Sequence, residues 1–180
     1  HGEMTIEIAP VAPAQHAEFA RTYRQHLAGA LASCERRANP GVAQLLDALA
    51  REPSTMGVLT GNFRDTGEMK LRACGIDPSR FVIGVFGDES PRTPPKRADL
   101  VELAMQRWEA RRGRPSASRE VVVIGDTPGD IDCAKAHGCR VLAVATGKFS
   151  VDQLTLHGAD LAVETLADTG FLTSWLMSGK

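Results

Sequence analysis

Short apolar runs alternate with longer amphipathic segments from residue 39 onward, and this alternation constrains the fold more than any other feature. The runs are rich in Val, Ile and Leu and are short enough to be single strands. Continuous apolar runs are typical of parallel strands that are buried on both faces. The sequence therefore predicts an α/β fold, a Rossmann-like three-layer parallel sheet with helices on both faces. Strands are predicted at 56–60, 80–87, 121–125 and 140–146.

The segments between these runs have the spacing and the end signals of helices. A glycine directly follows several of them, as is usual beyond the end of a helix. Ser150 and Gln153 form a capping-box pattern. Asn39 is the expected N-cap of the first of these helices, with Pro40 in its first turn. Helices are predicted over 40–50, 63–74, 99–113, 131–137 and 151–157, followed by a short apolar segment at 159–166 and an amphipathic tail.

A further helix is predicted nearer the N-terminus, over residues 14–32. Phe19, Tyr23, Leu27 and Leu31 recur every four residues there. This spacing places them in one apolar stripe along an amphipathic helix.

Composition excludes several classes of function. The chain has 180 residues and a net charge of −1, so no strong overall field attracts nucleic acid or an anionic membrane. No apolar run approaches the roughly 20 residues that span a bilayer, and no secretory leader is evident. The four cysteines, which have no zinc-site or CxxC spacing, are expected to be reduced thiols. We therefore expect a cytoplasmic protein that binds neither nucleic acid nor membrane. The cysteines are Cys34, Cys74, Cys133 and Cys139.

Two carboxylates follow the predicted strand at 121–125, in the stretch GDTPGD. Ligands of open α/β sheets bind beyond the carboxyl ends of the strands. Asp126 leaves the strand and Asp130 opens the next helix, so both carboxylates are candidates for one hard cation such as Mg²⁺. The alternative is structural, with Asp130 as a helix N-cap and Asp126 as a turn former. That alternative leaves the carboxylate at the end of an apolar strand unexplained.

The strand at 56–60 ends in LTGN. Thr60 offers a hydroxyl, and Gly61 lets the backbone approach a ligand closely. Asn62 can cap the next helix or donate a hydrogen bond to an oxygen atom. These residues are candidates for substrate binding, although such a turn is also common without function. Lys96 and Arg97 precede the helix at 99–113 and are candidates for balancing phosphate charge, or ordinary surface cations.

Together these motifs resemble the haloacid dehalogenase (HAD) superfamily of phosphohydrolases, in its phosphoglycolate-phosphatase-like branch. The resemblance covers about Pro40 to Leu166. It implies an Mg²⁺-dependent phosphatase for a small phosphorylated metabolite, with residues 39–180 as the HAD-like core. The helix at 14–32 resembles the end of the helical cap that such enzymes insert after their first strand. Residues 1–38 are therefore expected to be a cap remnant.

The resemblance also implies roles for individual residues. The threonine at the position of Thr60 binds the transferring phosphoryl group. A basic residue neutralises charge between nucleophile and phosphate, and its spacing to the following helix favours Arg97 over Lys96. Asp126 and Asp130 are implied to hold Mg²⁺, with Asp126 as the more direct ligand.

The sequence departs from the family at the nucleophile. The family uses the first Asp of a DxDxT stretch near the N-terminus, with the second Asp as general acid and base. The only DxD here is Asp130-Ile131-Asp132, within the metal loop. One hypothesis is that a preceding strand of the native protein carries DxDxT and that the enzyme works through an aspartyl-phosphate. The other is a catalytically inactive protein that binds phosphate or a partner. We favour the first because the remaining site residues still match phosphate and metal chemistry.

Metal-independent dehalogenation would leave the paired carboxylates without a role. Substrate identity and oligomeric state are not predicted.

Overall fold

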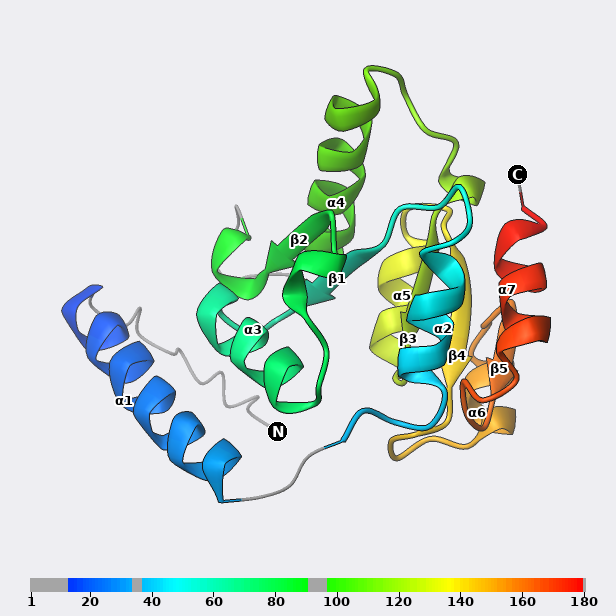
Figure 1. Cartoon of the computed structure of the whole chain (residues 1–180). Coiled ribbons are helices and arrows are strands. Elements are labelled where there is room, and N and C mark those ends of the chain that lie inside the picture. The colour runs from blue at the N-terminus through cyan, green and yellow to red at the C-terminus, as the bar shows by residue number, and fades with distance from the viewer. Residues whose placement is uncertain (1–12, 34–36, 91–96, 180) are drawn as a thin grey trace, which may run out of the picture. The chain divides into compact units, whose positions relative to one another are not determined.

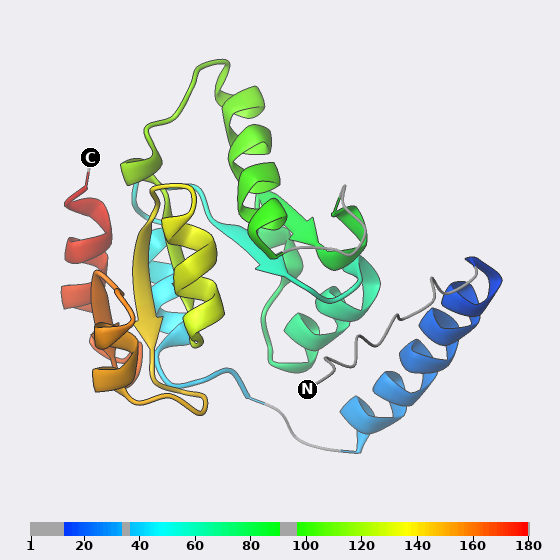
Figure 2. The ribbon, with the colours of Figure 1, turned by 180° about the vertical axis from the view of Figure 1, so that it is seen from behind.

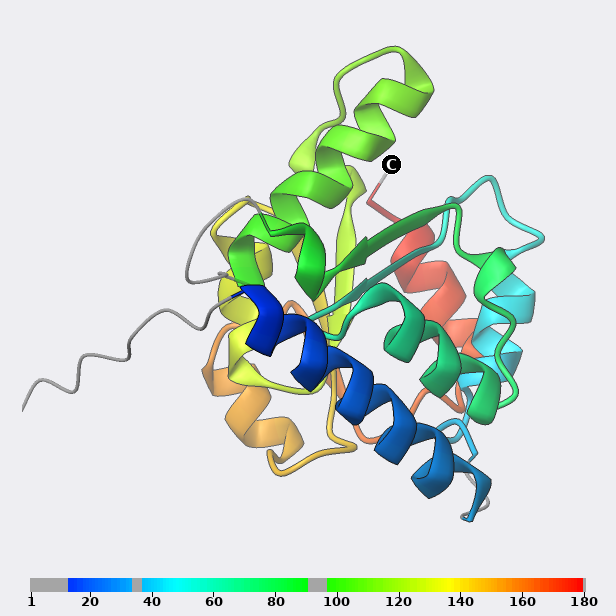
Figure 3. The same ribbon diagram turned by 90° about the vertical axis from the view of Figure 1, so that its left-hand side faces the viewer.

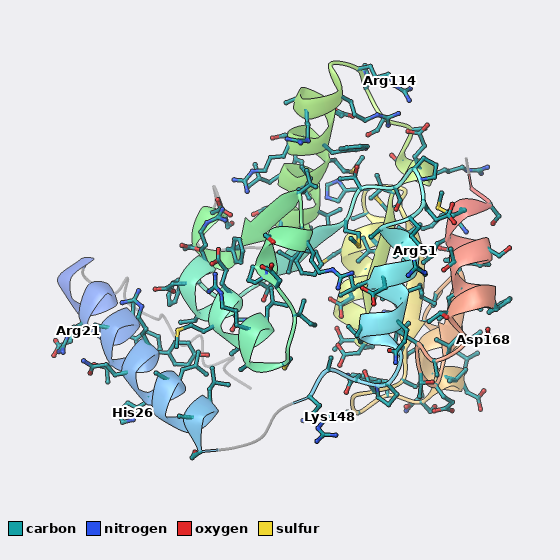
Figure 4. The ribbon with its side chains drawn as sticks, viewed as in Figure 1. Arg21, His26, Arg51, Arg114, Lys148 and Asp168 are labelled. Atoms are coloured by element: carbon teal, nitrogen blue, oxygen red, sulfur yellow. The ribbon has the colours of Figure 1, made fainter. Side chains whose placement is uncertain are left out.

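The computed structural model describes residues 13–33, 37–90 and 97–179, and it divides into two compact units, His1–Arg36 and Arg37–Lys180. The first unit contains α1 (Pro13–Ala32), which confirms the predicted N-terminal helix. Phe19 and Tyr23 stack along it with ring centroids 6.1 Å apart. Arg21 and His26, labelled in Figure 4, also project from this helix. Its origin as a cap remnant stays a prediction.

The second unit alternates strands and helices, as the apolar runs predict. Its strands are β1 (Gly57–Thr60), β2 (Ile83–Phe86), β3 (Val122–Gly125), β4 (Arg140–Val144) and β5 (Leu161–Val163). Its helices are α2 (Val42–Leu49), α3 (Arg64–Ala73), α4 (Arg97–Arg112), α5 (Pro128–Lys135), α6 (Val151–Leu156) and α7 (Thr169–Met177). Single 3₁₀ turns lie at Pro78–Arg80, Gly87–Glu89 and Ser118–Glu120.

Every strand pairing is parallel, but the strands form two sheets. One sheet has the order β3-β4-β5, and the other pairs β1 with β2. Figure 1 shows the three strands side by side, and Figure 3 shows the β1–β2 pair between α3 and α4. The division falls between β1 and β3. Each of these two strands therefore has one edge without a strand partner among the described residues.

The core confirms the predicted three layers. Val141 and Ala143 of β4 lie in one buried cluster with residues of α4, α5 and α6. Leu142 and Val144 point to the opposite face and lie in a second cluster with residues of α2 and α7. Figure 1 shows α2 in front of the sheet and Figure 2 shows α5 in front from behind, so these helices cover opposite faces. Burying each large aliphatic side chain stabilises the folded protein by about 1.5–3 kcal/mol. Because β4 buries such side chains on both faces, it is the central strand of the core.

Two predicted helix starts are wrong. The first helix is not capped by Asn39, because α2 begins at Val42 and its N-cap is Gly41, with φ at 87°. A Cβ on Gly41 would lie 2.0 Å from the backbone of Leu166, so this position requires glycine. The helix predicted at 131–137 begins at Pro128, three residues earlier, with Thr127 as its N-cap.

Among the described residues, Cys74, Cys133 and Cys139 form no disulfide, and Cys34 lies outside the described residues. In the described part of the chain, no helix combines the length and the apolar character that crossing a membrane requires.

An ion-pair network fixes the end of β2 against its neighbouring helices. Arg107 of α4 donates to Glu89 at 2.8 and 3.2 Å, and Arg64 of α3 donates to the same carboxylate at 3.0 Å. The backbone N–H of Phe86 adds a fourth bond at 2.9 Å. The bonds from Arg107 hold the pKa of Glu89 at about 2, against an ordinary 4.5, although burial opposes this shift. The carboxylate therefore stabilises the folded protein as long as it is ionised.

We expect Glu89→Gln to lower the free energy of unfolding at pH 7 by about 2 kcal/mol, as for other buried charge-assisted bonds. Because the folded pKa lies below the unfolded one, the stabilisation is complete above about pH 4.5 and declines as the pH falls toward 2. Urea unfolding at pH 7 and pH 3 should show that the difference in the free energy of unfolding between wild type and Glu89→Gln is smaller at pH 3.

Glu68→Gln is a matched control, since Glu68 pairs with Arg72 along α3 and Arg72 itself is 60% exposed. It should change the free energy of unfolding by less than about 0.5 kcal/mol. A Glu89→Gln effect that is equal at both pH values would contradict the assigned cause.

Candidate functional site

The loop after β3 is organised by the buried carboxylate of Asp130, which is only 6% exposed. Its Oδ2 accepts hydrogen bonds from the backbone N–H groups of Asp126 and Thr127 at 3.2 and 3.1 Å. The Thr127 hydroxyl donates to the same oxygen at 2.7 Å. Asp130 is thus the third residue of α5 in a capping box with Thr127, rather than the N-cap itself. Its carboxylate holds the turn between β3 and α5 in one shape.

Gly125, the last residue of β3, has no room for a side chain because the Asp130 side chain lies against it. A Cβ at Gly125 would lie 2.4 Å from the Cβ of Asp130 and 2.7 Å from its Oδ2. The role of Thr127 was missed in the sequence analysis. The pattern [ST]-x-x-[DE], which Thr127 and Asp130 form, is the signal that identifies it.

Asp126 differs from Asp130 in having an unbonded side chain. Its carboxylate is half-buried and makes no hydrogen bond or ion pair with any described residue. It leans over the loop that follows β4, where a Cβ on Gly147 would lie 2.7 Å from its Oδ2. Lys148, labelled in Figure 4, extends from this loop. A partly buried carboxylate without a partner is unfavourable, so its surroundings fit a bound cation.

The two carboxylates therefore fit Mg²⁺ unequally. Mg²⁺ takes one or two protein carboxylates and fills its other positions with water and substrate oxygens. The Asp126 carboxylate can take the role of a direct ligand, whereas the Oδ2 atom of Asp130 already accepts three hydrogen bonds. Among the residues that the structure describes, no three His, Cys, Asp or Glu side chains are grouped as a metal site.

At the end of β1, Thr60 and Asn62 form a second polar group. The side-chain Nδ2 of Asn62 donates to the Thr60 Oγ1 at 2.6 Å, and the backbone N–H of Asn62 donates to the same atom at 3.2 Å. The Asn62 carbonyl accepts from the N–H of Gly87 at 2.8 Å. A Cβ on Gly87 would lie 2.1 Å from the carbonyl oxygen of Gly61, so the ends of β1 and β2 are in close contact. The LTGN turn is therefore rigidly held.

Lys70 of α3 joins this group, and the sequence analysis missed it. Its Nζ donates to the Asn62 Oδ1 at 2.6 Å. Thr60, Asn62 and Lys70 line a cavity of about 320 Å³, together with Arg37. Among the described residues that line this cavity, none is acidic. No local pattern could have found Lys70, because it meets Asn62 only after two turns of α3.

The structure brings together Thr60 with Asn62, and Asp126 with Asp130. The cavity beside Thr60 does not include either carboxylate. Among the described residues no strand pairs with both β1 and β3, so their ends belong to separate sheets.

The basic candidates and two further carboxylates near the strand ends have other positions. Arg97 is the first residue of α4, but its side chain lies outside the described residues, as does all of Lys96. Asp132 pairs with His157 at 2.9 Å. Asp88 accepts from the backbone N–H of Arg64 at 3.2 Å, which caps α3.

Comparison with known proteins extends these observations. Residues 97–169 match the family described as HAD-hydrolase-like. A phosphoglycolate phosphatase from Rhodospirillum rubrum is 29% identical over 140 residues, which are 76% of this chain and 52% of that protein. One from Synechococcus elongatus is 27% identical over 163 residues, 91% of this chain and 71% of that protein. The chain thus spans about half the length of the Rhodospirillum protein.

Solved structures agree with the fold. A hydrolase from Pseudomonas syringae superposes with a TM-score of 0.68 at 21% identity, over 93% of this chain and 75% of that one. The match over residues 97–169 and the phosphatase relatives make this chain similar to the haloacid dehalogenase-like hydrolases, and the solved structure shares its parallel α/β fold.

Proposed function

We propose that the protein is an Mg²⁺-dependent phosphatase that hydrolyses a small phosphomonoester. The observation that carries this proposal is the unbonded, half-buried carboxylate of Asp126 at the carboxyl end of β3. The similarity to two phosphoglycolate phosphatases supports it and makes 2-phosphoglycolate a first substrate to test.

Asp126 is proposed as the direct protein ligand of Mg²⁺. Asp130 is proposed to hold the loop that aims Asp126, and its own coordination of the ion stays a prediction. When bound, Mg²⁺ supplies positive charge that draws the phosphate toward the attacking group and stabilises the charge that develops there.

Thr60 is proposed to bind the phosphoryl group through its hydroxyl, with Gly61 and Asn62 forming the turn around it. Both hydrogen bonds at the Thr60 Oγ1 are accepted ones, which leaves the hydroxyl proton available to a phosphate oxygen. Arg97, with Lys96 as the second candidate, is proposed to neutralise phosphate charge. Phosphoryl transfer depends mainly on such positioned positive groups.

The nucleophile is proposed to be an aspartate on a strand outside this sequence, paired between β1 and β3. The unpaired edges of these two strands support this position, since a strand there would join the two sheets into one. Its carboxylate oxygen would attack phosphorus as the bond to the leaving oxygen breaks, and a second carboxyl group would protonate that oxygen. Water would then hydrolyse the aspartyl-phosphate.

Replacing Asp126 tests the metal half of the site. In the full-length protein, we expect Asp126→Asn to lower kcat for 2-phosphoglycolate or another small phosphomonoester by about 100-fold or more, because it removes the charge that holds the cation. Phosphate release should stop in EDTA and return with Mg²⁺.

Asp132→Asn is the matched control, since Asp132 is exposed and pairs with His157. It should leave phosphate release unchanged. Turnover that survives both EDTA and Asp126→Asn would overturn the proposal, as would a full-length protein that hydrolyses no phosphomonoester.

Thr60 can be tested by comparing two substitutions. Thr60→Ala removes the hydroxyl and should lower kcat/KM by roughly 10- to 100-fold, in line with the loss of one donor to a reacting oxyanion. Thr60→Ser keeps the hydroxyl and should stay within a few-fold of wild type.

Thr55→Ala removes an exposed threonine just before β1 and serves as the control for changes in folding. If Thr60→Ala matches this control in steady-state kinetics, Thr60 does not bind the phosphoryl group.

A further inference from the structure

The direction of the hydrogen bonds around Thr60 is set by a residue outside the LTGN motif. A threonine hydroxyl has one proton to donate and two lone pairs to accept with. The Asn62 Nδ2 and backbone N–H both donate to the Thr60 Oγ1, at 2.6 and 3.2 Å. No described residue accepts a hydrogen bond from Thr60. The proton of this hydroxyl is therefore left for a group that enters the cavity.

This arrangement depends on which way the Asn62 amide faces. The two ends of an amide side chain have nearly the same shape, so the hydrogen-bonding partners decide its orientation. The ammonium group of Lys70 has only protons to offer, so the atom of Asn62 that it contacts at 2.6 Å must be Oδ1. The Nδ2 group then has to face Thr60. If the amide turned over, Oδ1 would accept the Thr60 proton instead.

We propose that Lys70 is a positioning residue that orients the Asn62 amide and thereby keeps the Thr60 hydroxyl proton available to the substrate phosphate. This inference rests on the proposed phosphatase function and adds a residue to it. Lys70 lies on α3, which also brings it to the wall of the cavity that Thr60 lines. Its positive charge on that wall, with Arg37 beside it, also favours an anionic ligand.

The test is a double-mutant cycle in the full-length protein, with KM and kcat for a phosphomonoester and the inhibition constant of inorganic phosphate as readouts. Lys70→Met should raise KM and the inhibition constant about tenfold, since it permits the unfavourable amide orientation, and should change kcat less. Lys70→Arg, which also only donates, should stay within about threefold of wild type. After Asn62→Ala, adding Lys70→Met should change either constant less than about twofold, because Lys70 acts through Asn62.

Arg72→Met is the matched control, as it removes a cation from the exposed side of the same helix, where Arg72 pairs with Glu68. It should leave all three constants unchanged. The positioning role is wrong if Lys70→Met leaves KM and the inhibition constant unchanged, as this control does. It is also wrong if Lys70→Met raises these constants by the same factor in the Asn62→Ala background as in wild type. In both cases the proposed phosphatase function remains. If wild type neither turns over a phosphomonoester nor binds inorganic phosphate, the proposed function fails and this inference fails with it.

Discussion

The burial of β4 on both faces is the constraint on which the other features depend. Four consecutive residues, Val141 to Val144, are buried, and they alternate between two separate apolar clusters. A strand in this position has no face on which a charged side chain can reach water. Polar residues are therefore excluded from positions 141–144, with Arg140 only at the start of the strand, and they collect where the strands end, beside the first turns of the following helices. The position of the candidate site follows from the position of the core.

The same arrangement recurs at two strand ends with different chemistry. After β3, Asp130 is committed to hydrogen bonds within its own loop, and the carboxylate of the neighbouring Asp126 has no bonding partner among the described residues. After β1, Asn62 is committed to Lys70 and Thr60, and no described residue accepts the Thr60 hydroxyl proton. In each pair, one side chain holds the backbone or its neighbour in place so that the other can face a ligand. A rigid loop with one available group loses little entropy on binding.

The sequence alone was sufficient to predict the features that depend on residues close together along the chain. The parallel α/β fold and the motifs at both strand ends follow from local apolar runs and from short spacings. The failures arose where a distant backbone segment decides the outcome. Gly41 caps α2 in place of Asn39 because the chain at Leu166 leaves no room for a Cβ. Lys70 was missed because its contact with Asn62 exists only once α3 has folded. The division of the sheet was equally invisible, since the sequence marks strands but not the absence of a partner between them.

The divided sheet also affects how copies of this chain can associate. One edge each of β1 and β3 has no strand partner among the described residues, and Ile124 on β3 is 42% exposed although it is apolar. Natural proteins protect such edges with charges, prolines or bulges, because a bare edge recruits strands from other molecules. No charged residue or proline lies within β1 or β3. In the described part of the chain, these edges have the composition of interior strands, and pairing of the edges between molecules is the expected route of self-association.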